Sequence, residues 1–203
     1  MSEPGGTRLS STPSFTGRIF SVTVDRVTVP NGRTVTLDIV RHPGSVVLLP
    51  MQDDAHIVLI RQYRYALDRW IWELPAGSLE VGEDPAAAAA RECEEEIGLV
   101  PGRVAFAGAW YPTPGFCTEV MNYYRLGDLR QPGPGDPQAR KDEDEDIRVQ
   151  VFSVEDARAM VRRGEIIDLK SAGASRSSSA ARCVGTNRAY DGRVLPLHFP
   201  PKW

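Results

Sequence analysis

Cysteine and histidine are scarce in this chain of 203 residues, which contains three of each. The cysteines, Cys93, Cys117 and Cys183, are odd in number and widely spaced, and no two of them form a Cys-x-x-Cys pair. Such spacing provides neither a disulfide framework nor the clustered ligands of a structural zinc site. We therefore expect a reduced protein of the cytoplasm that carries no zinc.

Long apolar runs and an excess of basic residues are also missing. No apolar run approaches the roughly 20 residues that a membrane-spanning helix needs, and residues 1–14 lack the apolar segment of a signal peptide. The formal net charge of −3 argues against a basic surface for nucleic acid. With 41% hydrophobic and 25% charged residues, the composition is typical of a soluble globular protein of about one domain. We expect neither a membrane nor a nucleic acid as partner.

Acidic residues are concentrated within residues 77–99, GSLEVGEDPAAAAARECEEEIGL, where four of the six residues from 91 to 96 are glutamates. Local signals mark both ends of a helix there. Asp84 is a good N-cap, Pro85 suits the first helical position and Gly98 is a natural stop. Because alanines of high helix propensity fill the first turns, the segment predicts a helix between Pro85 and Gly98.

The two sides of this predicted helix differ in character. At about 100° per residue, one side forms an apolar stripe that we expect to face a core: Ala86, Ala90, Cys93 and Ile97. The opposite side carries three carboxylates, with two small residues one turn earlier that leave room above it: Glu92, Glu95, Glu96, Ala88 and Ala89. Like charges within one turn repel each other. A hard divalent cation such as Mg²⁺ or Mn²⁺ would offset this repulsion, because it prefers carboxylate oxygens.

The same segment resembles a known signature. Its fixed positions are Gly77, Glu83 after five residues and, after seven more, Arg91-Glu92-Cys93-x-Glu95-Glu96-x-Gly98-Leu99. This pattern resembles the signature box of the Nudix hydrolases, with Cys93 where an aliphatic residue is usual. The resemblance implies an α/β fold, a Nudix-type α/β/α sandwich with a mixed sheet. It also implies a metal site formed by Glu92, Glu95 and Glu96, with Gly77, Glu83 and Arg91 in supporting positions.

Residues outside the box resemble the ADP-ribose pyrophosphatase subgroup of that family. WELPAG precedes the box at residues 72–77, and Pro114 follows it in a Thr-Pro-Gly-Phe setting. In the subgroup, the carbonyl that corresponds to Ala76 is a metal ligand. The substrate-binding residues that we assign here are Arg41, Arg64, Glu73, Pro114 and Gly115.

Five acidic residues follow one another at positions 142–146, directly before a predicted strand at residues 147–152. Taken alone, such a run is typical of a solvated turn. In the resembling subgroup, a mobile loop just before the corresponding strand supplies a glutamate that acts as general base. This likeness implies that Glu143 is the base and Glu145 a second carboxylate.

The chain divides into four parts. Residues 1–14, rich in Gly, Ser, Thr and Pro, are expected to be a disordered tail. Alternating apolar residues around the turn Pro30-Asn31-Gly32 predict an antiparallel β unit at residues 15–43, and the resemblance implies that this unit packs across a homodimer. The Nudix domain would span residues 44–171. Residues 172–203 lack helical periodicity, so we expect a poorly ordered or divergent tail.

The function that these resemblances imply is hydrolysis of ADP-ribose to AMP and ribose 5-phosphate with Mg²⁺ or Mn²⁺. One alternative is a pyrophosphatase for another nucleoside diphosphate sugar, such as GDP-mannose. The other is a non-catalytic Nudix module that senses a nucleotide. The box glutamates are all intact, which favours the enzyme.

Overall fold

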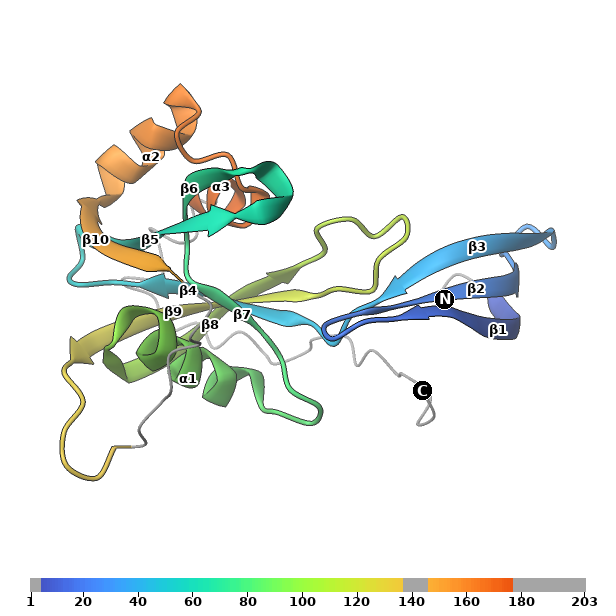
Figure 1. The fold of residues 1–203 in the computed structure, drawn as a ribbon, viewed down its shortest axis with the longest axis horizontal. Helices are drawn as coiled ribbons and strands as arrows, with labels where there is room; N and C mark the ends of the chain where they lie inside the picture. The colour runs from blue at the N-terminus through green and yellow to red at the C-terminus, as the bar shows by residue number, and fades with distance from the viewer. Residues whose placement is uncertain (1–4, 137–145, 177–203) are drawn as a thin grey trace.

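The computed structural model of the chain describes residues 5–136 and 146–176. In this part the strands form three sheets, in the orders β1-β2-β3, β10-β5-β6 and β7-β4-β9-β8. The first sheet extends away from the other two, and the two larger helices lie on opposite sides of those sheets (Figure 1). The expected α/β sandwich with a mixed sheet and an N-terminal antiparallel unit is confirmed.

The N-terminal sheet is antiparallel and consists of β1 (Thr7–Thr16), β2 (Ser21–Thr28) and β3 (Thr34–Arg41). The turn between β2 and β3 has Gly32 at a φ of 82°, a backbone conformation that suits glycine. Strand β1 differs from our expectation of a disordered tail at residues 1–14. Residues 7–14 are ordered because they belong to β1, which pairs along the whole of β2.

The mixed sheet is built around β4 (Ser45–Pro50), whose six residues are all buried. This strand pairs in parallel with β9 (Met121–Arg130) and antiparallel with β7 (Ala76–Ser78), while β8 (Val100–Trp110) pairs with the far side of β9. A strand buried on both faces is expected to be continuously apolar, as the sequence SVVLLP nearly is.

The third sheet contains β5 (His56–Arg64), β6 (Arg69–Glu73) and β10 (Ile147–Ser153), and a 3-10 turn at Tyr65–Leu67 joins the first two. Helices α2 (Val154–Arg163) and α3 (Leu169–Arg176) contribute to the core beside this sheet. Helix α3 corrects our expectation for residues 172–203, since residues 172–176 are helical and Ala174 is buried in that core. Residues 177–203 lie outside the described residues.

Helix α1 (Pro85–Ile97) begins and ends where the sequence predicts. The Asp84 carboxylate accepts the N–H of Ala87 at 3.0 Å, and Gly98 ends the helix at a φ of 71°. Its buried side, however, is rotated toward the carboxylates and comprises Ala88, Ala89, Glu92, Cys93, Glu96 and Ile97. Ala88 and Ala89 are fully buried rather than facing open space, because their small side chains allow the helix to pack closely against β4.

The Cys93 thiol belongs to this core, and burial, reinforced by the charges of Glu94 and Glu96, raises its pKa to about 12. It therefore stays protonated at neutral pH and acts as a small apolar group. Among the described residues, no helix combines the length and hydropathy that crossing a membrane requires.

Candidate active site

The box residues meet at the junction between β6, β7 and α1. The backbone carbonyl of Pro75 accepts the N–H of Leu48 at 2.9 Å, which fixes the chain between β6 and β7 to the mixed sheet. The next N–H, that of Ala76, donates to Oε2 of Glu96 at 3.0 Å. Two turns of α1 thus place carboxylates against the strand end: Glu96 is 5% exposed and Glu92 is 9% exposed.

A side chain at position 77 would collide with the Glu92 carboxylate. A Cβ atom built on Gly77 would lie 1.9 Å from Cδ of Glu92 and 2.4 Å from its Oε2. No pair of non-bonded atoms tolerates such a distance, so any side chain here would displace the Glu92 carboxylate. The fixed glycine of the box is therefore explained by the carboxylate that packs over it.

Arg91 joins three acidic residues of the box into one network. Its guanidinium donates from Nε and Nη2 to Glu83 at 2.9 and 3.1 Å, and from Nη1 to Glu92 at 2.8 Å and to Glu95 at 2.6 Å. The hydrogen bonds to Arg91 hold the pKa of Glu83 below its usual value, and those to Glu83 raise the pKa of Arg91. Arg91 thus contacts Glu95 one helical turn further along α1 and also Glu83, which precedes the helix.

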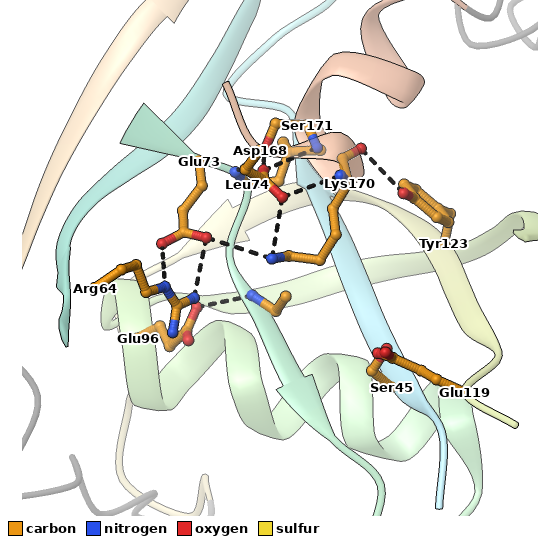
Figure 2. Close-up of polar contacts among 11 residues, drawn as sticks. Ser45, Arg64, Glu73, Leu74, Glu96, Glu119, Tyr123, Asp168, Lys170 and Ser171 are labelled. Carbon is orange, nitrogen blue, oxygen red and sulfur yellow. Dashed lines mark hydrogen bonds and ion pairs between the residues drawn. The ribbon is translucent and has the colours of Figure 1, made fainter. Parts of the chain in front are cut away.

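Arg64 and Glu73 lie together on neighbouring strands β5 and β6. Nε and Nη2 of Arg64 donate to the two carboxylate oxygens of Glu73 at 2.7 and 3.0 Å (Figure 2). The Glu73 side chain is fully buried, whereas 36% of the Arg64 side chain is exposed. A bidentate pair of this kind fixes the plane of the guanidinium, so Glu73 sets the orientation of a partly accessible cation.

Pro114 and Gly115 lie in the exposed connection between β8 and β9. Backbone hydrogen bonds attach this connection to the end of β3: the N–H of Val40 donates to Phe116 at 2.8 Å, and that of Thr118 donates to Val40 at 3.0 Å. The two predicted substrate residues thus belong to a loop whose position depends on the N-terminal sheet.

Arg41 ends β3, and its guanidinium contacts Asp25 and donates from Nε to the Thr23 hydroxyl at 3.2 Å. Burial disfavours the Asp25 carboxylate, but hydrogen bonds from Ser11 and Thr23 and the charge of Arg41 outweigh it and lower its pKa. The structure therefore places Arg41 within the N-terminal sheet, where it links β3 to β2.

Comparison with known proteins identifies the family. Residues 40–170 match the family described as NUDIX domain. The chain belongs to the NUDIX family. It is 37% identical over 204 aligned residues to an ADP-ribose pyrophosphatase of Mycobacterium tuberculosis, an alignment that covers 100% of this chain and 93% of the relative. An ADP-ribose pyrophosphatase of Bacillus subtilis is 36% identical over 158 residues, covering 78% of this chain and 84% of the relative. The chain is therefore a Nudix-type hydrolase.

A solved structure supports the fold separately. The crystal structure of an ADP compounds hydrolase superimposes with a TM-score of 0.71 over 86% of this chain and 92% of that chain. Since the two sequences are only 20% identical, this likeness bears on the fold alone.

The carboxylates of the Nudix box are not arranged as a preformed metal-coordination site. Among residues 5–136 and 146–176, no three His, Cys, Asp or Glu side chains are grouped closely enough to hold a metal ion. Glu92 and Glu95 are turned toward Arg91, and Glu96 toward the Ala76 N–H. The donor set nevertheless fits a hard divalent cation in its chemistry, because it consists of carboxylate oxygens on adjacent turns beside a backbone strand end.

Two predicted site residues cannot be placed. Glu143 and Glu145 lie outside the described residues, so their roles stay predictions. The described chain resumes at Asp146, directly before β10.

Sequence reasoning missed one group, formed by Asp168, Lys170 and Ser171. Lys170 Nζ lies 3.4 Å from Glu73 Oε2, and the N–H of Leu74 donates to the Ser171 hydroxyl at 2.7 Å (Figure 2). The available signal was local: an aspartate is a favoured N-cap residue, and Asp168 directly precedes the helical residues. Nothing in the sequence shows that this helix start lies against Glu73, which is 97 residues away.

Proposed function

We propose that this Nudix hydrolase cleaves the pyrophosphate bond of ADP-ribose and releases AMP and ribose 5-phosphate. The observation that carries the proposal is the junction at Ala76, where the buried carboxylates of Glu92 and Glu96 meet the strand end of the WELPAG segment. The two relatives named ADP-ribose pyrophosphatase, aligned over most of the chain, support the choice of substrate.

The proposed cofactor is Mg²⁺, with Mn²⁺ as an alternative, held by the Ala76 carbonyl and by Glu92, Glu95 and Glu96. A cation bound there would neutralise negative charge on the diphosphate and lower the pKa of the attacking water. Glu92 and Glu95 would exchange part of their contact with Arg91 for the cation. Arg91 would then keep its two hydrogen bonds to Glu83. From there it would orient the carboxylates that bind the cation.

The remaining residues would bind substrate and move a proton. The guanidinium of Arg64, oriented by Glu73, suits a phosphate oxygen, and the loop of Pro114 and Gly115 would border the substrate. Water would attack one phosphorus as the bridging P–O bond breaks, and Glu143 would accept its proton, with Glu145 close by. A general base has to approach that water within about 2.6–3.2 Å.

We also propose that the chain acts as a homodimer in the cytoplasm, joined through its N-terminal sheet, and that it does not bind nucleic acid. The support for the interface is a set of large apolar side chains on that sheet and its turns, each at least 39% exposed: Leu9, Phe15, Ile19, Phe20 and Leu37. Exposed apolar groups gathered on one projecting unit are typical of an interaction surface.

A substrate comparison tests the proposal. Purified protein with Mg²⁺ is incubated with ADP-ribose or GDP-mannose, and the products are separated by chromatography. The expected products are AMP and ribose 5-phosphate from ADP-ribose, with kcat/KM for ADP-ribose about tenfold or more above that for GDP-mannose. Preferential cleavage of GDP-mannose would favour the alternative substrate and refute the choice of ADP-ribose.

A further inference from the structure

The first turn of α3 lies against the residues that lead into the Nudix box. Asp168 caps this helix, because its carboxylate accepts the N–H groups of Lys170 and Ser171, each at 3.0 Å. We call Asp168, Lys170 and Ser171 the capping turn of α3. The hydroxyl of Tyr123 on β9 donates to the Lys170 carbonyl at 3.0 Å, which attaches the capping turn to the mixed sheet as well.

The capping turn contacts two consecutive residues at the end of β6. The Lys170 ammonium lies between two carboxylates, 3.4 Å from Glu73 Oε2 and 3.1 Å from Asp168 Oδ1. The Ser171 hydroxyl accepts the N–H of Leu74 at 2.7 Å in a buried environment. Figure 2 shows these contacts converging on one short stretch of chain from the side of α3.

Both ends of that stretch lead to groups of the active site. On one side, Glu73 orients the Arg64 guanidinium through two hydrogen bonds. On the other, Ala76 follows Leu74 by two residues and donates its N–H to Glu96. A shift of Glu73 or Leu74 would therefore move the Arg64 cation and the Ala76 carbonyl together.

The charges of this cluster argue for positioning rather than for direct phosphate binding. Two cations, Arg64 and Lys170, lie against two carboxylates, Glu73 and Asp168, so the cluster has no excess positive charge. Glu73 is fully buried, and removing one counter-charge from a buried carboxylate is costly. Without Lys170, the ion pair between Arg64 and Glu73 would have to rearrange, and the orientation of the Arg64 guanidinium would change.

We propose that the capping turn of α3 is a positioning element of the active site, in which Lys170 and Ser171 hold Glu73 and Leu74 and so orient Arg64 and the Ala76 carbonyl. The effect on substrate rests on the proposed function. The effect on the strand end does not, and it can be measured without substrate.

Amide hydrogen exchange of the full chain, without substrate, tests the positioning directly. Lys170→Met and Ser171→Ala are compared with Arg162→Met, which removes an exposed ion pair with Glu155 on the neighbouring helix α2. We expect exchange within residues 73–77 to become about tenfold faster in the first two variants and to stay unchanged in the control. Exchange that is equal in wild type and in both capping-turn variants would overturn the proposal.

Kinetics then separate positioning from a purely structural role. Lys170→Met is expected to raise KM for ADP-ribose about five- to tenfold, but less than about twofold further when Arg64→Ala is already present. If Lys170→Met leaves KM unchanged, the role is purely structural and the proposal is overturned. The same holds if the effects of Lys170→Met and Arg64→Ala on KM multiply in the double variant. A wild type that leaves ADP-ribose intact would refute the proposed function alone, and amide exchange would then decide the role of the capping turn.

Discussion

At the scale of single residues, the active site depends on the close packing of the Glu92 carboxylate against the backbone of Gly77. Glu92 packs so tightly over Gly77 that a Cβ there would overlap its carboxyl group. Nη1 of Arg91 donates to Oε1 of the same carboxylate at 2.8 Å. The Glu92 carboxylate thus has room only because residue 77 is a glycine, and Arg91 holds it in place. Both Gly77 and Arg91 are therefore expected to be sensitive to substitution.

Gly77→Ala is expected to destabilise the protein and reduce its activity, because the new methyl group has to displace Glu92. The free energy of unfolding should fall by about 1–3 kcal/mol, as is typical of overpacking, and urea denaturation measures it. Gly173→Ala is the matched control, since a Cβ on that helical glycine meets no atom within 4 Å. It should leave stability unchanged or raise it by up to about 1 kcal/mol. Equal stability of the two variants would contradict the steric explanation.

At the scale of secondary-structure elements, the start of α3 depends on an ionised carboxylate. Burial opposes the charge of Asp168, but Lys170 and the hydrogen bonds from Ser171 outweigh this and lower its pKa below the ordinary 3.8. A carboxyl whose pKa is lower in the folded than in the unfolded state stabilises the fold fully above its unfolded pKa. That contribution is lost as the pH falls toward the folded pKa.

Asp168→Asn is therefore expected to lower the free energy of unfolding by about 1–3 kcal/mol at neutral pH. The difference from wild type should shrink as the pH falls below the ordinary value of 3.8. Denaturation curves from pH 7 down to about pH 3 measure this difference, with Asp54→Asn as control because the Asp54 side chain is 81% exposed. A difference that stays constant over the whole range would show that the charge of Asp168 does not contribute.

Elements marked by local signals were predictable from the sequence, and those that depend on distant pairing were not. Asp84, Pro85 and Gly98 fixed the ends of α1 because capping involves only neighbouring residues. The buried side of α1 was predicted in part. Cys93 and Ile97 are buried as expected, but Ala88 and Ala89 are buried as well, because the alanines look alike in sequence and only the packing against β4 decides which of them are covered. Strand β1 was missed for a similar reason, since its order comes from pairing with β2.

The same distinction applies to the site. The Nudix box located Glu83, Arg91, Glu92, Glu95 and Glu96 within one short segment, and Arg91 contacts three of these glutamates, Glu83, Glu92 and Glu95. The capping turn of α3 was not found, because Lys170 and Glu73 are far apart in sequence and meet only through the fold. The placement of Glu143 and Glu145 remains a prediction.

At the scale of the whole molecule, the N-terminal sheet projects from the two sheets that carry the site (Figure 1). A three-stranded sheet with large apolar side chains exposed has little core of its own. Its contact with the loop of Pro114 and Gly115, made through Val40, links this sheet to the substrate region. Association of two chains through the sheet would therefore also affect the site.

We expect light scattering to give twice the chain mass of 22.4 kDa in solution. Phe20→Glu should shift the protein toward the monomer, because it places a charge within the apolar surface of the N-terminal sheet. Val81→Glu is the control, since Val81 is also apolar and fully exposed but lies in the loop before α1. A wild type that is monomeric at micromolar concentration, or a Phe20→Glu variant that is as dimeric as wild type, would contradict this interface.

The most direct test of the central claim is Mg²⁺-dependent release of AMP from ADP-ribose by wild type, Glu96→Gln and Glu94→Gln. Glu96 is a proposed ligand, whereas Glu94 is a neighbouring glutamate of the same helix outside the proposed ligand set. The account predicts that Glu96→Gln lowers kcat by about three orders of magnitude or more, because a cation loses a charged ligand, and that Glu94→Gln stays within about threefold of wild type. Equal activity of wild type and Glu96→Gln, or full activity of wild type in excess chelator, would contradict it.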